Sequence, residues 1–128
     1  MARLSKSSGA RGASEEQVQR AILDYLRVAL PRGSIVRVIP GGNRSRTTAV
    51  GYIAGTADIV ALIHMPGIGH RPFFLEVKRA KGGKVSQAQL DEQDYCWSRG
   101  VPYEIVASVV HAHAALLKHG VPLRARPA

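Results

Sequence analysis

Hydrophobic positions recur along the chain with two different spacings, and these spacings predict where helices and strands lie. After Ser14, apolar residues three to four positions apart predict a helix that ends near Leu30. Ser14 and Gln17 have the spacing of a capping box, which begins such a helix. Residues 35–39 are almost all β-branched, and they predict a strand that is ended by Pro40.

The second half of the chain contains two apolar runs joined by a turn rich in glycine and proline. Residues 58–63 are apolar on both faces after the first position, as in a central strand, and residues 73–78 predict the next strand. A helix over 87–99, a strand over 103–107 and a last helix ending near Lys118 follow. This order predicts an α/β fold with a mixed central β-sheet flanked by α-helices.

Three segments have no clear periodicity. Residues 1–13 are basic and lack an apolar core, so they predict a disordered arm and not a secretory signal. Residues 41–54 predict a polar loop, which passes into either a short strand or an extended approach to Gly55. Residues 121–128 predict a flexible tail. A single domain is therefore expected over residues 14–120, which is long enough for one core.

The charge of the chain narrows the class of its partner. There are 18 lysines and arginines against 9 acidic residues, and the net charge of +9 favours a polyanion, with nucleic acid first. A membrane surface is the alternative, but no basic amphipathic helix and no apolar run of spanning length stand out. The single Cys96 permits no intrachain disulfide and fits a reducing compartment. We therefore expect a cytoplasmic protein that is not secreted and has no membrane partner.

An acid opens the first central strand, and an acid and a lysine close the second. Alternate residues of a strand share a face, so Glu76 and Lys78 point the same way while Val77 enters the core. A hairpin between the two strands brings Asp58 close to Glu76. Two carboxylates there suit Mg²⁺ or Mn²⁺, with the main-chain carbonyl of Val77 as a further oxygen ligand. Glu15, expected on the inward side of the first helix, would complete the site directly or through water.

Together these residues resemble the PD-(D/E)XK nuclease superfamily, and more narrowly its VRR-NUC branch with small stand-alone phage and bacterial members. The resemblance covers about residues 14–107 and rests on Glu15, Gly55-x-x-Asp58, Glu76-Val77-Lys78 and Ser86-x-x-Gln89, in this order. The family name comes from a Val-Arg-Arg-like end to the catalytic strand. Here that end is Val77-Lys78-Arg79, which keeps the lysine.

The resemblance implies a restriction-endonuclease-like core and a metal-dependent phosphodiesterase that acts on DNA. Asp58 and Glu76 would be metal ligands, Lys78 a catalytic residue, and Gln89 a partner that lines the site. Stand-alone relatives imply a homodimer that cuts branched DNA such as a Holliday junction, in the cytoplasm of a bacterial or phage-infected cell.

Simpler interpretations stay open for the strand residues. Asp58 also fits a cap that only begins a strand. Glu76 and Lys78 also fit the solvated face of an edge strand, although their apolar neighbours argue against it. Cys96 has no matched histidine and acid, so a buried thiol is expected and not a nucleophile.

Alternatives also stay open for the two helical residues of the site. Glu15 fits a first-turn acid that serves only the helix dipole, and Glu16 competes with it for the family glutamate. Gln89 has two similar neighbours on its helix, Gln87 and Gln93.

Basic residues in the loops beside the proposed site are expected to contact DNA phosphates. They are Arg44, Arg46, Arg79, Lys81 and Lys84. Such contacts position DNA without reading its sequence, and solvated surface charge is the alternative for any one of them. Aromatic residues make up only 5% of the chain, which disfavours a stacking platform for single strands and favours duplex or branched DNA. The five histidines lack zinc spacing and are expected at the surface.

The sequence thus predicts a Mg²⁺- or Mn²⁺-dependent endodeoxyribonuclease. A non-catalytic DNA-binding module of the same fold is the alternative, and RNA stays open as a substrate.

Overall fold

A computed structural model describes residues 12–40 and 55–128 of the chain. The elements run α2 (Glu15–Ala29), β1 (Ile35–Val38), β2 (Ile59–Met65), β3 (Gly69–Val77), α3 (Gln87–Trp97), β4 (Tyr103–Val106) and α4 (Val109–Lys118). The predicted order of helices and strands is confirmed. The predictions for residues 1–11 and 41–54 lie outside the described residues.

The four strands form one sheet in the order β1-β2-β3-β4. The pairs β1–β2 and β2–β3 are antiparallel, and β3–β4 is parallel. The sheet is therefore mixed, as the sequence predicts. α3 supplies the long connection that a parallel pair requires.

The hairpin between β2 and β3 is tighter than the sequence predicts. The turn was expected over 64–72, but pairing continues to Met65 opposite Gly69. Pro72 lies inside β3, opposite Leu62. Phe74 donates its main-chain N–H to the carbonyl of Pro102, the residue before β4. Backbone nitrogens two residues apart on a strand point to the same side, so the nitrogen of Pro72 also points toward β4. The pairing of β3 with β4 begins only at Phe74. The missing N–H of the proline therefore removes no bond to β4.

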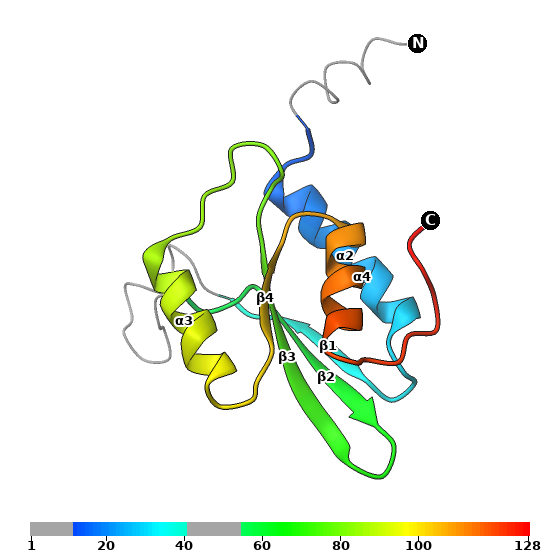
Figure 1. The fold of residues 1–128 in the computed structure, drawn as a ribbon. Helices are drawn as coiled ribbons and strands as arrows, with labels where there is room; N and C mark the ends of the chain where they lie inside the picture. Colours follow the sequence, from blue (N-terminus) through cyan, green and yellow to red (C-terminus); the bar gives the residue numbers. More distant parts are fainter. Residues whose placement is uncertain (1–11, 41–54) are drawn as a thin grey trace, which may run out of the picture.

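The helices cover the two faces of the sheet unequally. α2 and α4 lie side by side on one face, and α3 lies on the other (Figure 1). The larger core contains the inward residues of β2 and β3 and one stripe of α2. That stripe is the predicted one, and it contains Val18, Ile22, Leu26 and Ala29. Full burial of Ile22 and Leu26 stabilises the fold by about 1.5–3 kcal/mol each, which makes this face the main anchor of the helix.

α3 packs less deeply than the sequence suggests. The large apolar residues of this helix, Leu90, Tyr95 and Trp97, are each more than a third exposed. Cys96 is the buried residue of this helix, and the prediction of a buried thiol is confirmed. It joins Ala57 and Tyr103 in a small second cluster. A thin apolar contact leaves the polar side chains of α3 to determine how the helix sits on the sheet.

The carboxyl-terminal segment 121–128, for which the sequence predicts a flexible tail, lies against α2. Arg124 donates its main-chain N–H to Ala29 at 2.7 Å and its Nε to Leu30, also at 2.7 Å. Val121 is buried, and Leu123 packs against the core. The segment therefore satisfies carbonyl groups that would otherwise be left without partners at the end of α2.

Two of the five histidines, which were expected at the surface, bond groups from elements distant in sequence. His113 forms a 2.6 Å hydrogen bond with the hydroxyl of Tyr25, and that hydroxyl also donates to Ala125. His119 lies 2.6 Å from the buried carboxylate of Glu104. Both rings bridge elements distant in sequence, which local spacing does not encode.

In the part of the chain that the structure describes, no helix is long and apolar enough to cross a membrane.

Candidate active site

The hairpin brings Asp58 and Glu76 together at the end of the β2–β3 ladder. The last pair of that ladder is Ile59 with Leu75, so the residue before one strand and the penultimate residue of the other lie side by side. Asp58 accepts the main-chain N–H of Val77 on Oδ2 at 2.8 Å. This bond continues the ladder through a side chain and fixes the carboxylate. Because Ile59 and Leu75 both belong to the larger core, Asp58 and Glu76 face the opposite, α3 side of the sheet.

The Glu76 side chain is almost completely buried, and its two oxygens differ in their surroundings. Oε2 accepts a 2.6 Å hydrogen bond from Nε2 of Gln89 and lies 3.3 Å from Nζ of Lys78. Oε1 is buried with no hydrogen-bond partner among the described residues. A carboxylate oxygen buried without a donor is costly. A bound cation, or a water held by one, would remove that cost.

Burial and neighbouring charge shift the titration of both acids. Burial raises the pKa of Glu76 to about 8, with the negative charge of Asp58 adding to the increase and Lys78 opposing it. Burial also raises the pKa of Asp58, although the hydrogen bond from Val77 and the charge of Lys78 lower it in part. Two acids that resist ionisation together favour a cation between them, because a cation stabilises both charged forms.

Lys78 has the geometry that the alternation of β3 predicts. Its main-chain N–H donates to Val106 of β4, and its ammonium group remains partly exposed beside Glu76. β3 lies between β2 and β4, so the alternative that Glu76 and Lys78 occupy the solvated face of an edge strand is wrong. Lys78 can therefore reach both the buried carboxylate and solvent.

Gln89 reaches the site from the first turn of α3. Its Oε1 accepts the main-chain N–H of Ser86 in a capping box, and its Nε2 donates to Glu76. The two other glutamines of this helix have different partners. Gln87 donates to Asp91 on the helix surface, and Gln93 donates to the carbonyl of Tyr103. One amide thus both caps the helix and orients the buried carboxylate.

Glu15 lies at the beginning of α2, where its charge contributes to the raised pKa of Glu76. It is exposed, although the spacing of the helix places it in line with the buried stripe. It belongs to the first helical turn, before the buried stripe begins at Val18. No group of three or more His, Cys, Asp or Glu side chains among residues 12–40 and 55–128 is close enough to hold a metal ion.

A glycine and a tyrosine hold the segment that leads into Asp58. Gly55 has φ of +90°, and a Cβ there would lie 2.2 Å from the carbonyl oxygen of Ala88 in α3. The hydroxyl of the buried Tyr103 donates to the carbonyl of Gly55 at 2.5 Å. The motif includes Gly55, but the sequence analysis did not identify Tyr103. A tyrosine in a short strand indicates only a core residue, and its partner is 48 residues away.

The predicted phosphate contacts divide into two groups. Arg79, Lys81 and Lys84 lie exposed in the connection between β3 and α3, directly after the acid-lysine pair. The other two, Arg44 and Arg46, lie outside the described residues. The exposed group follows Lys78 without interruption by a helix or strand, which places basic charge next to the candidate site.

Comparison with known proteins identifies the fold. A solved structure described as "VRR_NUC domain" aligns with a TM-score of 0.55 and 24% identity, over 84% of this chain and 99% of that chain. A second, described as "VRR_NUC domain protein", aligns with a TM-score of 0.65 and 14% identity, over 85% of this chain and 89% of that chain. No family model and no curated protein matches the sequence. The chain therefore has the fold of VRR_NUC domains, as its motifs suggest.

Proposed function

We propose that this protein is a divalent-metal-dependent endonuclease that hydrolyses phosphodiester bonds in DNA. The observation that carries the proposal is the buried Glu76 carboxylate, which has one oxygen without a partner beside Asp58 and Lys78. A purely structural carboxylate in this position would be expected to have both oxygens satisfied. The fold of VRR_NUC domains and the net charge of +9 support the same conclusion.

The oxygen-rich donor set fits Mg²⁺ or Mn²⁺. Asp58 and Glu76 would hold the ion with the main-chain carbonyl of Val77, and Glu15 would act through a water. When bound, the ion supplies Lewis-acid stabilisation of phosphate charge and a more acidic water. Gln89 holds the Glu76 carboxylate in one orientation. Lys78 donates to a phosphate oxygen or to the attacking water and thereby offsets negative charge that develops during cleavage.

Substrate and assembly are further parts of the proposal. The low aromatic content gives little stacking surface for single strands, so duplex or branched DNA is the proposed substrate, with four-way junctions first. A homodimer is proposed because cutting a junction needs two sites, one for each of two strands. Sedimentation equilibrium of the full chain, with and without junction DNA, measures this directly, and a monomer in both conditions contradicts it.

The function is tested with a cleavage panel. Four-way junctions, flaps, linear duplexes, single strands and RNA duplexes are incubated with the protein and Mg²⁺, Mn²⁺ or EDTA. We expect metal-dependent cutting of a DNA substrate, strongest on branched DNA. Glu76→Gln and Asp58→Asn should each reduce cutting by at least about 1000-fold, since each removes charge that holds the cation.

Glu16→Gln is the matched control, because it removes a carboxylate from the exposed first turn of α2. It should cut like the parent. If no metal supports cleavage of any substrate while DNA is still bound, the chain is a DNA-binding module of nuclease fold. If only RNA is cut, the substrate class is wrong and the site assignment stands.

A further inference from the structure

One buried tyrosine connects two segments of the candidate active site. Tyr103, the first residue of β4, is 1% exposed, and it packs with Ala57 in the smaller core cluster. Its hydroxyl donates to the carbonyl of Gly55, with 2.5 Å between the two oxygens. Gly55 lies three residues before Asp58, and Ala57 lies directly before it. Tyr103 therefore holds the chain that leads into Asp58 at two points.

The main chain of the same tyrosine holds α3. The carbonyl of Tyr103 accepts a 2.9 Å hydrogen bond from Nε2 of Gln93 and a 3.0 Å hydrogen bond from Nε1 of Trp97. Because α3 buries little apolar surface, these two bonds help to determine where the helix lies on the sheet. The same helix carries Gln89, which orients the carboxylate of Glu76.

The two segments held by Tyr103 touch each other beside the candidate site. Gly55 lies against the first turn of α3, where a Cβ on the glycine would be 2.2 Å from the carbonyl oxygen of Ala88. The same Cβ would be 3.2 Å from the main-chain nitrogen of Gln89. Tyr103 thus fixes both sides of this contact, one by its hydroxyl and the other by its carbonyl. A shift of either side would change the separation between Asp58 and the pair formed by Gln89 and its carboxylate partner.

Packing alone does not account for a tyrosine at this position. A phenylalanine would fill the same space without a polar group that needs a partner in the core. Burial raises the pKa of the Tyr103 hydroxyl well above its usual range, and the negative charge of Glu76 adds to the increase. The hydroxyl therefore keeps its proton, and with it the bond to Gly55, at neutral and mildly alkaline pH.

β3 holds Asp58 from the other direction along the chain. The main-chain N–H of Asp58 donates to the carbonyl of Leu75, and its Oδ2 accepts the main-chain N–H of Val77 at 2.8 Å. These bonds connect Asp58 to the strand that carries Glu76, whereas the bond from Tyr103 connects the preceding segment to β4 and α3. Asp58 is thus located both by the residues it pairs with and by the segment that leads into it.

We propose that Tyr103 is a positioning residue of the candidate active site. Its hydroxyl, acting through Gly55, keeps the Asp58 carboxylate beside Glu76 in the arrangement that binds a divalent cation. The inference rests on the proposed function for the cation, whereas the placement of Asp58 can be measured without one.

The first test compares metal binding by Tyr103→Phe and Tyr25→Phe. Tyr25 supplies the matched control, because it is also buried and its hydroxyl also donates to a main-chain carbonyl, that of Ala125 at 3.0 Å. It lies on α2, on the opposite face of the sheet from α3 (Figure 1). Each variant keeps the aromatic ring that fills the core, so both should fold. Isothermal titration of the full chain should show Mn²⁺ affinity lowered about 10-fold in Tyr103→Phe, as for groups that orient metal ligands, and unchanged in Tyr25→Phe.

The second test measures the placement of Asp58 in EDTA by amide hydrogen exchange. The main-chain N–H of Val77 donates to Oδ2 of Asp58, and that of His64 donates to Oγ of Ser34 at the far end of β2. Tyr103→Phe should accelerate exchange at Val77 about 10-fold more than at His64, because it loosens the chain around Asp58 locally. Tyr25→Phe should change both amides by the same factor.

The outcomes separate this inference from the proposed function. Equal acceleration at Val77 and His64 in Tyr103→Phe means that the hydroxyl only stabilises the fold, and it overturns the inference. Mn²⁺ affinity that is unchanged in this variant, or that falls equally in Tyr25→Phe, also overturns it. If the parent binds no Mn²⁺ and cuts nothing, the proposed function fails, and the exchange ratio alone decides whether Tyr103 positions Asp58.

Discussion

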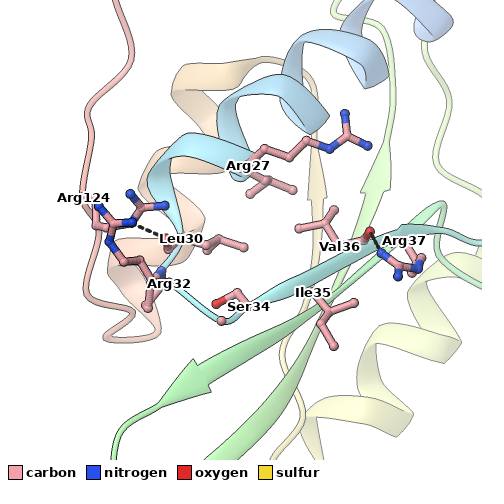
Figure 2. Close-up of a pocket in the computed structure, with 11 residues that line it drawn as sticks. Arg27, Leu30, Arg32, Ser34, Ile35, Val36, Arg37 and Arg124 are labelled. Carbon is pink, nitrogen blue, oxygen red and sulfur yellow. Dashed lines mark hydrogen bonds between the residues drawn. The ribbon is translucent and has the colours of Figure 1, made fainter.

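The two ends of α2 lie beside opposite charges that are held in opposite ways. At the first turn, Glu15 acts on a buried carboxylate that two side chains orient, namely Gln89 and Lys78. At the last turn, exposed arginines line an open cavity (Figure 2). Both arrangements agree with the helix dipole. Hydrogen bonds hold the acidic end in one arrangement, as the proposed chemistry would require, whereas the basic end is open to solvent.

Among these predictions, the largest effect is expected for Lys78→Ala, at the acidic end of α2. Removal of this ammonium should lower the cleavage rate by about 100- to 1000-fold, because it lies 3.3 Å from the buried carboxylate and faces the proposed phosphate. DNA affinity in EDTA should change only as much as it does for Lys84→Ala, the loss of one exposed charge in the next loop. Single-turnover rates and filter binding measure the two effects. Equal loss of cleavage in both variants would mean that Lys78 serves only as surface charge.

Glycine substitutions compare the rigidity of the two ends. Gly55→Ala should lower the free energy of unfolding by about 2–4 kcal/mol, because its positive φ is combined with a clash between Cβ and Ala88. Gly33, in the turn before β1, has nearly the same φ of +89°, but its Cβ would only touch His64 at 3.5 Å. Gly33→Ala should therefore lose about 1 kcal/mol. Urea denaturation checks both, and equal losses would contradict a tighter acidic end.

The acidic end should also control the pH dependence of metal-free stability. The folded protein binds a proton on Glu76 up to a pKa of about 8, whereas an unfolded glutamate releases it near about 4.3. The folded state thus holds more protons between these values, so stability falls as pH rises, by about 1 kcal/mol per pH unit. Asp58, whose pKa is also raised, adds to the fall at the acidic side.

Glu76→Gln supplies the comparison for that measurement, because glutamine does not titrate. Denaturation in EDTA from about pH 5 to about pH 8 should show a shallower decline for the variant than for the parent. Parallel curves would mean that burial does not perturb Glu76. In the parent, Mg²⁺ or Mn²⁺ should restore stability at pH 8 more than at pH 6, since the cation replaces the proton.

The smallest effect is expected for Glu15→Gln. An acid that contributes through water should alter the apparent metal affinity by only about a few-fold, below the about 10- to 100-fold typical of groups that orient metal ligands directly. The pKa of Glu76 should fall slightly, because one of the charges that raise it is gone. Isothermal titration with Mn²⁺ measures the first effect, with Glu16→Gln beside it. A loss in the Glu16 variant alone would exchange the roles of the two residues.

The sequence by itself determined those features of the protein that depend on residues close together along the chain. The capping box at Ser14 and the apolar stripe after it fix where α2 begins and which face it buries. The one-residue gap between Glu76 and Lys78 fixes their common side of β3. The position of Asp58 at the head of β2 brings it to Glu76 once the hairpin closes. Each of these depends on residues that are neighbours along the chain or across one turn, so a short pattern is enough to encode it.

Only the tertiary structure decided how these parts are enclosed. The parallel pairing of β4 with β3 covers one edge of β3, and α3 brings Gln89 to Glu76. The exposure of Glu15 depends on where α2 lies over the sheet, which its own periodicity does not state. Arg27 and Arg124 line one cavity at the end of α2 because the carboxyl-terminal segment lies against this helix. Contacts of this kind join distant segments through packing and hydrogen bonds, and no local pattern in the chain records them.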